Sequence, residues 1–274
     1  MPNTATSSAF LRRGSGKSIK ATQVKVVVCG CGTGLPCVDS SCSSVFVSIG
    51  NEKVLLDIGP GAMRQLARMD ISYNDIDRLL ITHTHIDHIN DLSHLLFISK
   101  YEVAPRNRDL HIIAPKGFRK FFCNLVSLFG EQIKSEKYEV LIQEAEDSKI
   151  ELSGWKVFTK PTRHILPGIA YRLEEGDRSL VYTGDTELTT DVVELSKDAD
   201  LLITECSFPD DERVVGHMTP KSVAALIKQA QPKRVLITHI YPILGRKNAV
   251  SLVKSHLDGD FCIEDAYDFM SVEL

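Results

Sequence analysis

The sequence predicts an α/β layered sandwich, and two observations point to it. Short apolar segments rich in β-branched residues alternate with amphipathic segments of helical period, the pattern of strands packed against helices. In addition, VLLDIG followed by IDRLLITHTH is echoed by LVYTGD followed by ADLLITECSF. Two structurally related halves would leave such an echo, so we expect residues 21–274 to form one domain of paired halves.

The first half begins with strand signals. VKVVV at 24–28 predicts a buried strand that enters a glycine-rich turn at 30–34. Residues 45–49 and 53–58 flank Gly50 and Asn51, which favours a hairpin. Residues 62–69 have helical character, and DRLLIT at 77–82 predicts a further short strand.

The second half repeats the strand signals at 179–182, 200–204 and 234–238. Between the last two, residues 220–229 predict a helix, because Val223, Leu226 and Ile227 recur at i, i+3 and i+4. Thr219 and Pro220 supply its cap and its first-turn proline.

The overall charge is mild. With 32 basic and 36 acidic residues the net charge is −4, which does not indicate a general polyanion binder. There is no apolar stretch long enough to predict a membrane span. Residues 1–20 are rich in Ser and Thr and basic, which fits either a disordered tail or an organelle-targeting segment. We therefore expect a cytoplasmic protein, with organellar import as the alternative.

Seven cysteines are an odd number, and no secretory signal precedes them, which indicates a reducing compartment. Four of them lie between 29 and 42, where two interpretations stay open. They could pack as small buried residues under the glycine-rich turn. Alternatively, they could form a thiolate zinc site, although the C-x-C spacing differs from that of zinc ribbons.

The strongest chemical signal follows the strand at 77–82. His83, His85, Asp87 and His88 lie within six positions. Residues two apart on an extended segment point to the same side, so His83 and His85 can converge on one metal ion. The turn behind them would direct Asp87 and His88 to a second ion. Imidazole and carboxylate are zinc-type ligands; the alternative is a solvated histidine-rich loop.

This run resembles the H-x-H-x-D-H signature of the metallo-β-lactamase superfamily, and the neighbouring motifs resemble its ribonuclease Z branch. The resemblance implies a four-layer αββα sandwich. The motifs occur in the order expected of that branch: GTGLP at 32–36, LDIGPG at 56–61, GDT at 184–186, LITECSF at 202–208, GHMT at 216–219 and TH at 238–239.

The resemblance also implies two zinc ions, for which manganese or iron could substitute. Glu205 and His217 would form a proton-donating pair, with Asp87 contributing to catalysis as well as to metal binding. Asp57 is a candidate partner for a ligand histidine, or else a buried capping residue. Of the implied ligands, His83, His85 and His164 would hold one ion, Asp87, His88 and His239 the other, and Asp185 would bridge both.

The function these residues imply is a binuclear zinc phosphodiesterase that uses a metal-bridging hydroxide on small or cyclic diesters, or on RNA 3′ ends. A homodimer is compatible with the resemblance. One alternative is a ribonuclease Z-type tRNA 3′-endonuclease. Others are a carboxylic ester, thioester or lactone hydrolase and, least favoured, a non-catalytic scaffold.

Three features bear on the tRNA alternative. Residues 165–184 suffice for a strand pair and a turn but leave no room for a tRNA-binding arm there. Ile86 stands where that branch usually has glycine, which predicts a narrower mouth. A basic segment could contact phosphates instead, or form a solvated helix face. Its basic residues are Lys100, Arg106, Arg108, Lys116, Arg119 and Lys120.

Overall fold

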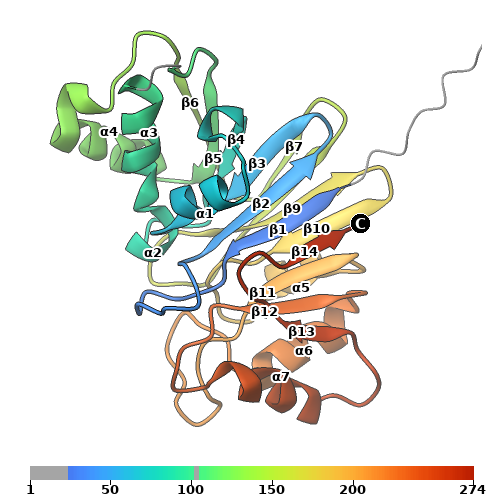
Figure 1. Cartoon of the computed structure of the whole chain (residues 1–274). Coiled ribbons are helices and arrows are strands. Elements are labelled where there is room, and N and C mark those ends of the chain that lie inside the picture. The colour runs from blue at the N-terminus through green and yellow to red at the C-terminus, as the bar shows by residue number, and fades with distance from the viewer. Residues whose placement is uncertain (1–23, 102–104) are drawn as a thin grey trace, which may run out of the picture.

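The structure is a computed structural model that describes residues 24–101 and 105–274. Two seven-stranded sheets pack against each other, and helices cover both outer faces, with α1, α3 and α4 on one side and α6 and α7 on the other (Figure 1). The predicted α/β sandwich with four layers is therefore confirmed. The predicted tail at 1–20 lies outside the described residues.

The first sheet is built mainly from the N-terminal half, and its strand order is β14-β1-β2-β3-β4-β5-β6. The three pairs from β14 to β3 are antiparallel, and the three from β3 to β6 are parallel. Its strands are β1 (Lys25–Gly30), β2 (Ser44–Ile49), β3 (Glu52–Leu56), β4 (Arg78–Leu80), β5 (Leu110–Pro115), β6 (Val140–Ala145) and β14 (Ser271–Glu273).

The second sheet repeats this plan in the order β7-β8-β9-β10-β11-β12-β13, again with three antiparallel pairs followed by three parallel ones. The sequence echo thus falls on equivalent strands, β3 and β4 in one sheet and β10 and β11 in the other. Its strands are β7 (Ser148–Glu151), β8 (Lys156–Pro161), β9 (Ile169–Glu175), β10 (Arg178–Tyr182), β11 (Leu201–Glu205), β12 (Val235–Thr238) and β13 (Ile263–Asp265).

Three buried clusters separate the four layers. One lies between the sheets, and Val47, Leu56, Leu173 and Ile203 belong to it. The second packs the first sheet against α1, α3 and α4, and the third packs the second sheet against α5, α6 and α7. The helices are α1 (Ala62–Arg68), α2 (Ile86–Ile89), α3 (Asp91–Tyr101), α4 (Phe118–Phe129), α5 (Thr190–Ser196), α6 (Pro220–Ala230) and α7 (Arg246–Ser255), with short 3-10 turns at Tyr73–Asp75 and Gly130–Gln132.

The local predictions agree with these elements, apart from some ends. The β2–β3 hairpin turns at Gly50, whose φ is 58°, and α6 begins with a capping box between Thr219 and Ser222. The strand expected at 53–58 ends earlier, at Leu56, because Asp57 has a φ of 55° and leaves the extended conformation. This early end directs the Asp57 side chain into the space between the halves.

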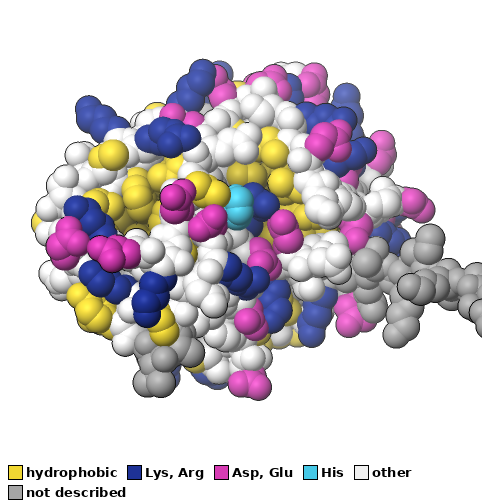
Figure 2. Space-filling model, turned by 90° about the horizontal axis from the view of Figure 1, so that it is seen from above, with side chains coloured by type: hydrophobic (Ala, Val, Ile, Leu, Met, Phe, Trp, Pro, Cys, Tyr) yellow, Lys and Arg dark blue, Asp and Glu magenta, His cyan; other side chains and the backbone are white. Residues whose placement is uncertain are grey.

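The basic segment contributes to the fold instead of forming a free basic face. Arg106 is 1% exposed and donates hydrogen bonds to the carbonyls of Arg108 and Asp109. Arg108 pairs with Asp77 and donates to the carbonyl of Asn74. On the face shown in Figure 2, basic and acidic side chains are interspersed around a band of apolar side chains. That face therefore has no single-sign field that would attract a polyanion.

No helix in the described ranges, 24–101 and 105–274, is long and apolar enough to cross a membrane.

Tyr171 joins the two sheets through a polar contact inside the core. Its hydroxyl lies 2.8 Å from the carbonyl oxygens of both Ile81 and Ile113, in the first sheet. We expect Tyr171→Phe to lower the free energy of unfolding by about 1–2 kcal/mol, because the buried carbonyl of Ile81 loses this donor, whereas that of Ile113 keeps the backbone N–H of Ile81. Urea denaturation measures this loss. Tyr267→Phe, at a tyrosine that is 57% exposed, is the control and should change stability little.

Candidate metal centre

The ends of five strands deliver the chemically active side chains to one place. His83 and His85 follow β4, and His164 follows β8. Asp185 follows β10, Glu205 is the last residue of β11, and His239 follows β12. In the second sheet β10, β11 and β12 are parallel, so their carboxyl ends share one edge, where ligands commonly bind in α/β proteins.

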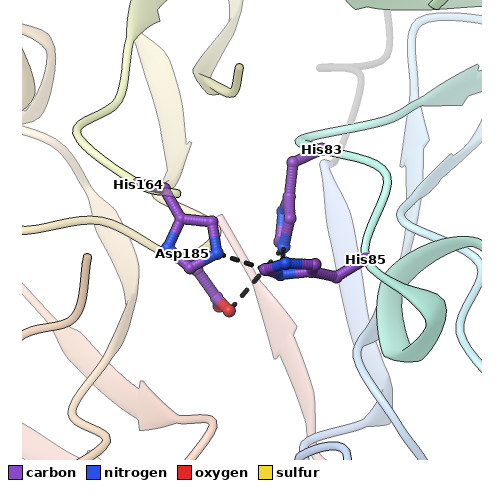
Figure 3. Close-up of side chains that lie close together, drawn as sticks. All are labelled: His83, His85, His164 and Asp185. Atoms are coloured by element: carbon purple, nitrogen blue, oxygen red, sulfur yellow. Dashed lines mark hydrogen bonds and ion pairs between the residues drawn. The ribbon is translucent and has the colours of Figure 1, made fainter. Parts of the chain in front are cut away.

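The first group of donors contains His83, His85, His164 and Asp185, whose ligand atoms all lie within 4.8 Å of one another. Nδ1 of His85 lies 3.1 Å from Nε2 of His83 and 3.0 Å from Nε2 of His164. Figure 3 shows His83 and His85 reaching from the loop after β4 towards His164 and Asp185 on the other half. The expected convergence of His83 and His85 is therefore present.

The second group contains Asp87, His88 and His239. Asp87 and His88 lie on the one-turn helix α2, which redirects the chain immediately after His85. Oδ2 of Asp87 lies 3.2 Å from Nε2 of His239 and 3.8 Å from Nε2 of His88. The turn behind His85 thus directs these two side chains away from the first group, as expected.

Asp185 connects the two groups. Its Oδ2 lies 3.8 Å from Nε2 of His83, while its Oδ1 lies 3.4 Å from Nε2 of His88 and 3.6 Å from Nδ1 of His239. Each carboxylate oxygen therefore faces a different group, the arrangement expected of a bridging ligand.

The protonation and hydrogen bonding of these residues fit a cation. Burial lowers the pKa of His83, His85 and His164, which favours the neutral imidazole that binds metals. Burial opposes a charge on His88, yet the carboxylates of Asp185 and Asp57 raise its pKa well above the usual value. The centre is thus negative enough to attract positive charge.

Two buried donor atoms of the centre, Nε2 of His88 and Oδ1 of Asp185, face each other at 3.4 Å but make no hydrogen bond with any residue that the structure describes. Unpaired buried polar atoms are costly, and a metal ion would coordinate both. The residues present therefore fit a metal ion.

A second layer of contacts orients the donors. Asp57 is fully buried and accepts from Nδ1 of His88 at 2.7 Å and from the backbone N–H of Thr82 at 2.7 Å. The structure therefore supports its role as partner of His88, a predicted ligand, whereas Asp57 caps none of the described helices. Holding Nδ1 leaves Nε2 of His88 directed at the centre.

Gly216 orients His164 in the same way. Its carbonyl oxygen lies 2.8 Å from Nδ1 of His164. Its φ is 88°, and a Cβ there would lie 2.7 Å from that nitrogen, so only glycine allows this approach.

His217 and Glu205 form the expected pair. Nδ1 of His217 lies 3.1 Å from both carboxylate oxygens of Glu205. Burial opposes protonation of His217, but the hydrogen bond and charge of Glu205 raise its pKa. His217 also lies close enough to Asp185 and His239 to form a third, overlapping group of donors.

Other candidates lie elsewhere. Across the described parts of the chain, no cysteine belongs to a group of metal donors, and burial raises the pKa of Cys29 and Cys31 to about 12. The packed-thiol interpretation therefore holds for Cys29 and Cys31, whereas Cys42 is half-buried and Cys37 is exposed. His94 and His111 also lie outside the groups of donors. Ile86 is 72% exposed, so its side chain does not pack against the core, and the narrower mouth that it predicts stays a prediction.

The profile of a family described as "Beta-lactamase superfamily domain" matches residues 52–240, well over half of the chain. The chain belongs to the metallo-β-lactamase superfamily. The matched segment includes all seven predicted ligands, Glu205 and His217. The protein is accordingly a metal-dependent hydrolase.

Individual relatives agree with this assignment. The chain is 25% identical over 306 residues to a protein named ribonuclease Z from Archaeoglobus fulgidus, covering 91% of this chain and 97% of that protein. The structure of the metallo-β-lactamase fold protein YhfI from Bacillus subtilis aligns with a TM-score of 0.80 at 23% identity, over 92% of this chain and 99% of that one. The short form of human tRNase Z aligns with a TM-score of 0.71 at 23% identity, over 90% and 98%.

Sequence reasoning missed several supporting residues of this metallo-β-lactamase centre. The Ser207 hydroxyl contacts Glu205 and lies 3.1 Å from Nδ1 of His239, and the Tyr182 hydroxyl donates to Asp57 at 3.0 Å. Ser207 lies inside the LITECSF motif, two residues after Glu205, so the motif could have identified it as a supporting residue. Tyr182 and Asp57 are far apart in sequence, and no local pattern relates them.

Removing metal should destabilise the protein, because the unpaired donors and neighbouring carboxylates would lose their cation. We expect the melting temperature to fall by about 5–10 °C after dialysis against a chelator, for an ion at about 100 times its Kd. Adding zinc back should restore it. An identical melting curve with and without chelator would contradict metal binding by these residues.

Proposed function

We propose that residues 21–274 form a binuclear zinc phosphodiesterase, in which the seven donors hold two zinc ions. The observation that carries the proposal is the His217–Glu205 pair, which lies beside the donors with Nδ1 of His217 3.1 Å from the carboxylate. A leaving alkoxide needs a proton, and an imidazole oriented by a carboxylate can deliver one. Neither His217 nor Glu205 belongs to the first two groups of donors, which contain the seven predicted ligands.

The donor set determines what a metal could contribute. When bound, a zinc pair supplies water with a pKa of about 7 and positive charge opposite the phosphate oxygens. Asp87 is positioned to assist the attacking water, because its side chain is 16% exposed while Oδ2 stays within 3.2 Å of His239. Its carboxylate can accept a hydrogen bond from that water and orient it towards phosphorus.

His217 acts on the opposite side of the reaction. Glu205 holds Nδ1–H of its imidazole, so Nε2 is the nitrogen available to the substrate. Glu205 is itself fixed, because Oε1 accepts from the backbone N–H of Thr186 at 2.7 Å. The pair can therefore protonate the leaving oxygen with little reorganisation.

Small or cyclic diesters and short RNA ends are the substrates we favour. Residues 164–185 hold only the β9–β10 pair and its turns, so this stretch contains no arm to grip a folded RNA. Arg106 and Arg108, which could have replaced the arm, bind this chain's own carbonyls and Asp77. Cleavage of precursor tRNA remains the second candidate, because curated relatives are named ribonuclease Z.

Hydrolysis of bis-p-nitrophenyl phosphate by the zinc-loaded protein tests the proposal, with p-nitrophenyl acetate as the carboxylic ester for comparison. We expect diester turnover to exceed ester turnover. We also expect His217→Ala to lower kcat by about 100-fold or more on a dinucleotide, whose alkoxide needs a proton, and by less on the p-nitrophenyl diester. His94→Ala, at an exposed histidine of α3, is the matched control.

Two results would overturn the proposal. One is ready hydrolysis of the carboxylic ester without diester cleavage. The other is that His217→Ala lowers dinucleotide cleavage and carboxylic ester hydrolysis by the same factor. If precursor tRNA were cleaved at a single site much faster than any dinucleotide, the second candidate would replace the first.

A further inference from the structure

A pocket of about 600 Å³ opens beside His217, and three basic side chains line it. Arg163 directly precedes His164, Arg213 lies in the loop before His217, and Lys221 lies in the first turn of α6. The pocket therefore joins the proposed proton donor to a cluster of cationic groups that the proposed reaction does not yet use.

The two acidic residues of this pocket have partners from the protein itself. Glu187 accepts the backbone N–H of Gly216 at 3.0 Å. Asp210 accepts the backbone N–H of Lys221 at 3.0 Å, and its other oxygen lies 2.9 Å from Nε2 of His256. These contacts fix the loops and satisfy carboxylate oxygens of both residues.

The basic side chains of the pocket, in contrast, make few contacts with acceptor groups of the protein. Within the residues that the structure describes, the Arg213 guanidinium and the Lys221 ammonium make no hydrogen bond or ion pair. Arg163 is 71% exposed at its side chain and has one long ion pair, 3.9 Å from Glu187. Arg106 and Arg108, by comparison, are occupied by their own chain. The pocket thus offers cationic groups without built-in partners.

A second pocket adjoins this one, so the space is larger than a single phosphate group needs. Arg163 and Leu188 also line a neighbouring polar pocket of about 530 Å³, formed with Thr189, Thr190 and Asp191. Arg163 therefore stands between two adjoining hollows, which together have room for a sugar or base beyond a phosphate.

We propose that this pocket binds a second phosphate group of the substrate, carried on the alcohol that leaves from the diester. This inference rests on the proposed phosphodiesterase function. Since His217 would protonate the leaving oxygen and also lines the pocket, the leaving alcohol enters there. A phosphate on that alcohol meets the guanidinium groups of Arg163 and Arg213, which bind phosphate in a bidentate manner, and the ammonium of Lys221. The substrate class is therefore a nucleotide-like diester with a further phosphate on its leaving side.

Three dinucleotides test the inference: UpU, pUpU and UpUp, with bis-p-nitrophenyl phosphate as the reference substrate. The products identify which nucleoside is released as the alcohol. We expect the terminal phosphate on that fragment to raise kcat/KM about tenfold over UpU. This increase should become smaller at higher salt concentration, because salt screens the attraction between phosphate and basic side chains. The double variant Arg213→Ala/Lys221→Ala should lose this advantage, seen as the ratio of kcat/KM for the two dinucleotides.

The control is Arg64→Ala/Lys120→Ala, which removes the same two charges from exposed positions on α1 and α4. It should keep the full phosphate advantage. A wild-type enzyme that gains nothing from either terminal phosphate, or only from the one on the retained fragment, would overturn the inference. So would an unchanged ratio in Arg213→Ala/Lys221→Ala. In each case turnover of bis-p-nitrophenyl phosphate would leave the proposed function standing, whereas its absence in the zinc-loaded wild type would remove both.

Discussion

The carboxylate of Asp57 holds the two halves of the molecule and the centre between them in one arrangement. It accepts hydrogen bonds from the backbone and hydroxyl of Thr82, from Nδ1 of His88 and from the hydroxyl of Tyr182. These donors come from the loop after β4, from α2 and from the second sheet. A fully buried carboxylate is tolerated only when its oxygens are satisfied in this way. The position of every donor around β4 and α2 therefore depends on this contact.

The same contact determines which nitrogen of His88 faces the centre. By occupying Nδ1 of His88, Asp57 leaves Nε2 buried and without a hydrogen bond among the described residues, 3.4 Å from Oδ1 of Asp185. Asp185 in turn faces His83 on one side and His239 on the other. The fold thus places buried ligand atoms without hydrogen bonds where its two halves meet. A cation placed there would satisfy them, so metal binding and stability are coupled in this account.

Much of this arrangement could be predicted from the sequence where the determining contacts are local. The alternation of side chains around His83 and His85 predicted their convergence, and the turn after them predicted the separate direction of Asp87 and His88. The echo between the halves predicted two related halves, and the structure shows that their sheets share the same succession of strand directions. In these cases a few neighbouring residues determine the geometry.

The rest depends on contacts between distant parts of the chain. Nothing near Arg106 indicates that its guanidinium is buried and bound to carbonyls, so a basic segment could equally have been a phosphate-binding surface. The C-terminal strand β14 pairs with β1, which no local pattern could reveal. The approach of Gly216 to His164 likewise requires the folded loops. Such features follow from tertiary packing alone.

The most direct test of the central claim, that seven side chains hold two ions, is the metal content of the protein. The chain should be saturated with zinc, freed of unbound ion by gel filtration and measured by elemental analysis. We predict about two zinc ions per chain. Retention of no zinc, or of only one ion that survives replacement of both His164 and His239 by alanine, would contradict the account.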